Sequence, residues 1–121
     1  MRSFIILFCL GIFTINSACA QKVAPKPVNI IFDSDMGPDY DDAGAITILH
    51  ALADKGECNI LATIASTKYE GVAGVFSVFN TYFKRPGIPV GVPKGDALEL
   101  RDWQHWTDTL LAKYPHKLKN N

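Results

Sequence analysis

Short apolar runs alternate along this chain with stretches in which apolar residues recur at helical spacing. Three runs have the length and β-branched content of strands, namely residues 28–32, 60–65 and 88–92. Three stretches have apolar residues three or four positions apart and a Gly or Pro at or after their end: residues 42–56, 70–84 and 103–114. Strands that are apolar almost throughout, alternating with helices, predict an α/β fold with a parallel sheet and helices on both faces.

The segment before the first strand predicts an export signal rather than part of the fold. Arg2 supplies a short positive region, residues 4–15 are apolar, and small residues at 17–20 offer a cleavage site before Gln21. We therefore expect residues 1–20 to be a signal peptide and the protein to be exported, periplasmic or extracellular.

Two alternatives to a cleaved signal are open. An uncleaved anchor needs a spanning helix of roughly 20 residues, and the apolar run is shorter than that. Lipid attachment at Cys19 is the other, although Asn16 stands where an aliphatic residue is usual. Residues 21–27, with two prolines, are expected to be a linker without regular structure.

Charge and cysteine content narrow the class of protein. Without residues 1–20 the chain keeps 11 basic and 12 acidic residues, which gives no electrostatic footprint for nucleic acid or an anionic membrane surface. Cys58 is then the one cysteine left, so an intramolecular disulfide is excluded. Its position at the start of an apolar run predicts a buried structural thiol rather than a reactive one.

Five of the 12 acidic residues fall within ten positions, between the first strand and the first helix: Asp33, Asp35, Asp39, Asp41 and Asp42. In a parallel α/β sheet, ligands bind at the carboxyl ends of the strands. Carboxylates gathered in one loop repel one another, and a hard divalent cation such as calcium or magnesium relieves that repulsion. Gly37 and Pro38 allow the chain to turn, so we expect residues 33 and 35 to converge with residues 41 and 42.

The alternative is a solvated turn in which Asp39 or Asp41 caps the helix and Asp42 favours its dipole. The Asp33-x-Asp35 pair favours a functional site instead, because it follows directly on an apolar strand, where charge is not needed for solubility.

Two known types of acidic loop share features with this pattern. An EF-hand loop is excluded, because Pro38 stands where that loop needs Gly and Gly44 stands where it needs Glu. A haloacid-dehalogenase-like phosphatase is a rival, since that family also follows an apolar strand with Asp-x-Asp, of which the first Asp is the nucleophile. The second Asp pair, at residues 41 and 42, departs from the phosphatase pattern.

The runs IIFDSDMG at residues 30–37 and DDAGAI at residues 41–46 resemble the opening motif of the nucleoside hydrolase family of the inosine/uridine-preferring type. That family opens with a strand, then Asp-x-Asp-x-Gly-x-Asp-Asp-Ala-x-Ala and a helix. Residues 69–72 and 89–93 also look like an exported bacterial branch of the family. The resemblance covers residues 28–119 and implies a Rossmann-like nucleoside hydrolase fold, of which residues 28–121 are the N-terminal part.

The resemblance implies hydrolysis of the N-glycosidic bond of ribonucleosides with calcium (Ca2+) as cofactor. Asp35 would be the catalytic base and a calcium ligand, and Asp42 a second calcium ligand. Asp41 would bind a ribose hydroxyl, and Asp33 would support the acidic network. An anionic pocket favours the oxocarbenium-like ribose that forms as the bond breaks. The implied partner is a small-molecule nucleoside or ribosyl substrate, and a homo-oligomer is compatible with it.

The chain departs from the family pattern in three ways. Pro38-Asp39-Tyr40 stand where the family has one residue, which makes Asp39 an alternative to Asp41 as the substrate-binding residue. Residues 66–69 contain no Asn, where the family has a ribose contact. Family chains are more than twice as long and carry further calcium ligands and the leaving-group acid in their later part. We therefore expect this chain to be a truncated form that lacks turnover alone.

Other residues are weaker candidates for the site. The three histidines are candidates for the leaving-group acid, but surface or packing roles are expected for them: His50, His105 and His116. Trp103 and Trp106, three positions apart, could stack on a base, but a packed helix face is expected for them. A phosphatase with Asp33 as nucleophile and a non-catalytic metal-binding remnant are the alternative functions.

Overall fold

The structure, a computed structural model, describes residues 25–118 of the chain. The expected signal peptide, Cys19 and the first part of the linker lie outside these residues. The elements follow in the order β1 (Val28–Ser34), α1 (Asp41–Asp54), β2 (Cys58–Ala65), α2 (Val72–Tyr82), β3 (Val90–Gly91) and α3 (Trp106–Lys113). This alternation confirms the predicted α/β class. No helix within residues 25–118 has the length and apolar character needed to cross a membrane.

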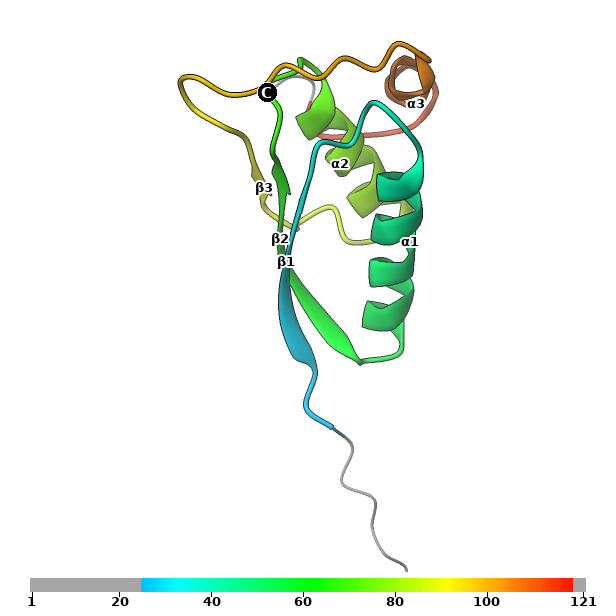
Figure 1. The fold of residues 1–121 in the computed structure, drawn as a ribbon. Helices are drawn as coiled ribbons and strands as arrows, with labels where there is room; N and C mark the ends of the chain where they lie inside the picture. Colours follow the sequence, from blue (N-terminus) through cyan, green and yellow to red (C-terminus); the bar gives the residue numbers. More distant parts are fainter. Residues whose placement is uncertain (1–24, 119–121) are drawn as a thin grey trace, which may run out of the picture.

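The three strands form one parallel sheet in the order β1-β2-β3 (Figure 1). β1 pairs with β2 along its whole length, with a shift in register between Ile30 and Ile31. β3 pairs through two residues only, shorter than the predicted run 88–92. Prolines at positions 89 and 93 explain this, because proline has no N–H to donate to a neighbouring strand. The carbonyl of Pro89 still accepts the Thr63 N–H at 3.0 Å.

The expectation of helices on both faces of the sheet is wrong for residues 25–118, because α1, α2 and α3 all lie on one face (Figure 1). On the other face, Ile31 and Leu61 remain 57% and 48% exposed. Connections between neighbouring parallel strands are almost always right-handed, so the side on which the next strand is added decides which face of the sheet the connecting helix covers. The strand order β1-β2-β3 therefore requires α1 and α2 to share a face.

The apolar core lies between the sheet and α2. Phe76 of α2 is fully buried and meets Phe32 of β1 edge to face, with ring centroids 6.2 Å apart. Ile46 of α1 and Met36, from the loop between β1 and α1, are also fully buried in this cluster. Cys58 is buried too, as predicted, and its thiol donates to the Leu49 carbonyl at a distance of 3.6 Å. The loop that carries the acidic residues is thus anchored in the core through Met36.

Local backbone features set the helix bounds. α1 ends before Gly56, whose φ of +73° suits a glycine after a helix. α2 begins after Gly71, which has φ of +99°. α3 begins at Trp106, three residues later than predicted, because His105 has φ of +58° and breaks the helical path.

Candidate functional site

The acidic loop, residues 33–42, lies at the carboxyl end of β1 and leads into the N-terminal end of α1 (Figure 1). This is the edge of the parallel sheet at which ligands bind in α/β folds. The last residue of β1 is Ser34 and the first of α1 is Asp41. The six residues between them reverse the direction of the chain, as the turn predicted at Gly37 and Pro38 requires.

Met36 fixes the course of the loop. Its side chain is fully buried, and its backbone has φ of +42°, which is unusual for a residue with a Cβ. Its N–H donates to the Ser34 hydroxyl at 3.0 Å and to Oδ2 of Asp42 at 2.9 Å. Backbone of this kind costs energy and persists where surrounding contacts impose it, which is frequent at functional sites. The bond to Met36 also places the Asp42 carboxylate beside the start of the loop.

Asp35 and Asp42 meet as a pair of partly buried carboxyl groups. A hydrogen bond between the two side chains raises the pKa of Asp35 above its ordinary value, and desolvation and the charge of Asp42 act in the same direction. Two carboxyl groups so close favour a shared proton or a cation between them. The sequence predicted that residues 35 and 42 would converge, and the structure brings them together.

Asp39 and Asp41 form a second pair, at the exposed rim of the loop. Their mutual hydrogen bond raises the pKa of Asp39 and lowers that of Asp41. The N–H of Asp42 donates to Oδ1 of Asp41 at 2.9 Å, which also lowers the pKa of Asp41. Both carboxyl groups are open to solvent and therefore to a ligand above the loop.

Asp33 does not join either pair. It lies within β1, next to Phe32, whose ring points to the helices, and side chains alternate between the two faces of a strand. Asp33 is therefore exposed on the face that carries no helix, and no hydrogen bond links it to either pair among the bonds found in residues 25–118. Capping by Asp39 or Asp41 is wrong, because Tyr40 occupies the N-cap of α1 and makes no side-chain cap bond. The other part of that alternative is confirmed, because Asp42 lies in the first turn, where its charge favours the helix dipole.

Residues from the distant segment 100–106 hold the loop from outside. The Trp106 indole N–H donates to the Gly37 carbonyl at 3.1 Å, and the Gln104 amide donates to the Pro38 carbonyl at 2.9 Å. No local pattern in the sequence points to Gln104, because its partner lies 66 positions away.

Asp102 organises this distant segment. It is 2% exposed, and its Oδ2 accepts the N–H and hydroxyl of Thr107 at 2.8 and 2.7 Å. Desolvation alone raises the pKa of Asp102, but these bonds and the one from the Gln104 N–H outweigh it and lower the pKa overall. Asp102 therefore supports the start of α3, and with it Trp106.

The histidines take surface or packing roles as expected, but the packed helix face expected of the tryptophans is confirmed for Trp106 and wrong for Trp103, which lies before α3. His50 is fully buried away from the loop, and His105 is exposed and paired with Asp108 at 2.9 Å. His116 contacts the Tyr114 carbonyl at 2.9 Å. Trp103 is 78% exposed, whereas Trp106 packs against the core and lies 5.8 Å from the Tyr40 ring.

The donor set of the loop fits a hard cation in part. Asp35 and Asp42 offer carboxylate oxygens, the ligands that calcium prefers. Within residues 25–118, however, no group of three or more His, Cys, Asp or Glu is arranged to hold a metal ion. Two protein carboxylates are therefore what this part of the chain contributes, and water or substrate hydroxyls would have to complete the shell.

Comparison with known proteins gives no match: no family model, no curated protein and no solved structure matches this chain. The likeness to nucleoside hydrolases is thus a likeness of motif. The motif lies on a strand, a loop and a helix in the order that the family requires, at residues 28–54. The function is inferred from the acidic loop itself.

Proposed function

We propose that the acidic loop is the calcium- and ribose-binding part of a nucleoside hydrolase, which cleaves the N-glycosidic bond of ribonucleosides. The observation that carries this proposal is the placement of the Asp42 carboxylate beside Asp35 at the carboxyl end of β1, where Oδ2 of Asp42 accepts the Met36 N–H at 2.9 Å. The buried Met36 holds this pair in place through its N–H bond to Asp42. A pair of like charges in a fixed loop is costly unless a cation or a proton occupies it.

The proposed roles use the placement of the residues in the loop. Asp35, a partly buried carboxyl group at the carboxyl end of β1, takes a proton from the water that attacks the anomeric carbon. Asp42 and Asp35 would hold the calcium ion, whose positive charge would orient a sugar diol and make water easier to deprotonate. Asp41 or Asp39, exposed at the rim, accepts a hydrogen bond from a ribose hydroxyl. Their summed negative charge stabilises the positive charge that develops on the ribose as the bond breaks.

The number of acids in the loop favours this function over an Asp-x-Asp phosphatase. Besides Asp33, which would be the phosphatase nucleophile, the loop carries four other acids, and their negative charge would repel a phosphate. Beryllium fluoride, which mimics a phosphoryl group on a carboxylate, is expected not to bind. Its capture on Asp33 would support the phosphatase instead.

Calcium titration by calorimetry tests the metal part of the proposal. The chain is expected to bind calcium, and D35N and D42N each weaken binding by about tenfold or more, since affinity depends on the number of charged ligands. D96N is the matched control, because Asp96 is an exposed acid outside the loop and is expected to leave the affinity unchanged. Equal weakening by D96N, or no calcium binding, would contradict the proposal.

The ribose part needs a separate readout. A cationic iminosugar with ribose stereochemistry mimics the charge of the transition state and should bind more tightly than neutral ribose. We expect its binding to require calcium and to weaken in D41N or D39N. Calcium-dependent ribose release from inosine, uridine or a nitrophenyl riboside would overturn the expectation that this chain lacks turnover alone. Calcium binding without any affinity for the iminosugar would leave a non-catalytic metal-binding protein.

A further inference from the structure

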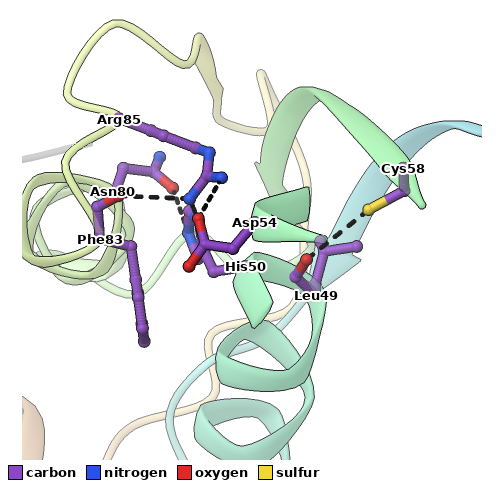
Figure 2. Close-up of polar contacts among 7 residues, drawn as sticks. All are labelled: Leu49, His50, Asp54, Cys58, Asn80, Phe83 and Arg85. Carbon is purple, nitrogen blue, oxygen red and sulfur yellow. Dashed lines mark hydrogen bonds and ion pairs between the residues drawn. The ribbon is translucent and has the colours of Figure 1, made fainter. Parts of the chain in front are cut away.

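His50 lies in a closed polar cluster at the C-terminal end of α1, well away from the acidic loop (Figure 2). The imidazole is fully buried and stacks on the Phe83 ring, with centroids 4.6 Å apart and planes inclined by 16°. Its Nε2 lies 3.1 Å from Oδ1 of Asn80, and its Nδ1 lies 3.5 Å from a guanidinium nitrogen of Arg85. Both ring nitrogens thus face a polar partner.

Arg85 fixes which ring nitrogen carries the proton. A guanidinium group only donates hydrogen bonds, so the facing Nδ1 must be the bare acceptor and Nε2 must carry the hydrogen of a neutral ring. Nε2 then donates to Oδ1 of Asn80. The Asn80 amide is left to donate its own N–H, and it meets the Thr63 hydroxyl at 3.3 Å. The hydrogen bonds that run from Arg85 through His50 and Asn80 to β2 can all form only when His50 carries its hydrogen on Nε2.

The position of Arg85 is itself fixed. Its guanidinium pairs with Asp54 of α1 at 2.6 Å and donates to the Phe83 carbonyl at 3.3 Å (Figure 2). Its backbone N–H donates to the Asn80 carbonyl at 2.7 Å. These bonds hold the guanidinium beside the imidazole, although the Arg85 and Asp54 side chains are 26% and 65% exposed.

We propose that His50 is an acid-sensitive latch, which joins the last turns of α1 to the C-terminal end of α2 while its imidazole is neutral and opens when the imidazole gains a proton. A proton on Nδ1 removes the acceptor for Arg85 and places a second positive charge against the guanidinium, inside a desolvated contact. The charged ring is accommodated only when α1 and residues 80–85 separate. This latch does not depend on the proposed hydrolase function.

The groups that face the imidazole together lower the pKa of His50 and so favour its neutral form. Burial lowers the pKa of His50 below its ordinary value of 6.5, and the charge of Arg85 lowers it further. The Asn80 bond and the charge of Asp54 oppose these effects without reversing them. From β2, Thr63 contributes an uncharged hydroxyl through Asn80, and Cys58 directs its thiol to the Leu49 carbonyl (Figure 2).

The sign of the pH effect follows from the lowered pKa. The unfolded chain takes up a proton on His50 near pH 6.5, whereas the folded chain resists it until lower pH. The latch therefore stabilises the fold fully above pH 6.5. Its contribution is lost as the pH falls from 6.5 through the folded-state pKa.

Nitrogen-15 NMR of the full chain tests the latch directly. At neutral pH we expect the His50 ring to carry its proton on Nε2 and to leave Nδ1 bare. On acidification, the appearance of a doubly protonated His50 should coincide with changed signals from Asn80 and Phe83. A proton on Nδ1 at neutral pH, or protonation of His50 with those signals unchanged, would show that no latch exists.

Denaturant unfolding between pH 7 and pH 5 gives the second measurement. The folding equilibrium constant of the unaltered chain is expected to fall by up to about tenfold per pH unit from the His50 proton. H50Q keeps polar groups at the site without a titrating ring and should lack this part of the fall, whereas H105Q, at an exposed histidine, should retain it. An unchanged fall in H50Q would overturn the latch, and if H50Q fails to fold, the NMR measurement decides.

Discussion

The polar clusters at the two ends of α1 differ in how their charges and hydrogen bonds are paired. At its N-terminal end, Asp35 and Asp42 bring like charges together, and the Met36 N–H that donates to Asp42 carries no positive charge to balance them. At its C-terminal end, the histidine cluster matches each donor with an acceptor, from Arg85 through His50 to Asn80. The first cluster is partly open to solvent, and the second is centred on a fully buried ring.

The difference separates a candidate ligand site from a structural network. A satisfied network needs nothing further, so its residues are explained by the stability and the single geometry that they give to the fold. Like charges held together by a strained, buried residue such as Met36 cost stability in the absence of a ligand. Proteins retain such costs where a site needs them, which is why the acidic loop, and not the histidine cluster, carries the functional proposal.

The largest effect is expected from N80A, which removes the centre of the satisfied cluster. The substitution leaves the Nε2 hydrogen of His50 and the Thr63 hydroxyl buried without their partner. Unsatisfied buried groups cost about 1–3 kcal/mol each, so we expect the free energy of unfolding to fall by about 2–3 kcal/mol in urea denaturation at pH 7.

N29A is the control for N80A. Asn29 also makes an amide–amide hydrogen bond, to Asn59 at 3.1 Å, but both residues are exposed. Its loss should change the free energy of unfolding by about 0.5 kcal/mol or less, because water replaces the bond. Similar losses for N80A and N29A would mean that the histidine cluster is no more important than a surface contact.

Calcium is expected to stabilise the acidic end of α1 by a smaller amount. A ligand that binds only the folded chain adds RT ln(1 + [L]/Kd), which is about 1.4 kcal/mol at ten times the Kd. Thermal unfolding followed by circular dichroism should therefore shift to higher Tm with calcium and return with a chelator. The same calcium concentration should leave the Tm of D42N almost unchanged. An equal shift in D42N would place the bound calcium elsewhere.

The sequence predicted the order of elements better than their arrangement. Apolar runs and helical spacing located β1, α1, β2 and α2 to within a few residues, because those signals are local. The placement of all helices on one face depends on the order of strands in the sheet, which no local pattern contains. The late start of α3 depends on Asp102 and His105, whose backbone and bonds form only in the folded chain.

The candidate site was predictable to the same extent. The turn at Gly37 and the two acidic pairs are visible in ten consecutive residues, so the meeting of positions 35 and 42 was expected. The exposure of Asp33 within β1 follows from that strand running on to Ser34, past the end predicted at residue 32. The support from Trp106 lies 69 positions away from Gly37 and becomes visible only in three dimensions.

The smallest effects are expected from an Asp-to-Asn substitution near each end of α1. The two changes in the free energy of unfolding should have opposite signs. D35N in the presence of a chelator removes a like charge and allows an amide to donate to Asp42, so we expect the free energy of unfolding to rise by about 0.5 kcal/mol. D54N at the other end weakens the ion pair with Arg85, which is partly exposed, and should lower it by about 0.5 kcal/mol. Urea denaturation at pH 7 of both variants, with the unaltered chain in parallel, resolves the signs. A loss of stability in D35N as large as that in D54N would mean that the acidic loop is satisfied without a cation, and the contrast between the two ends of α1 would disappear.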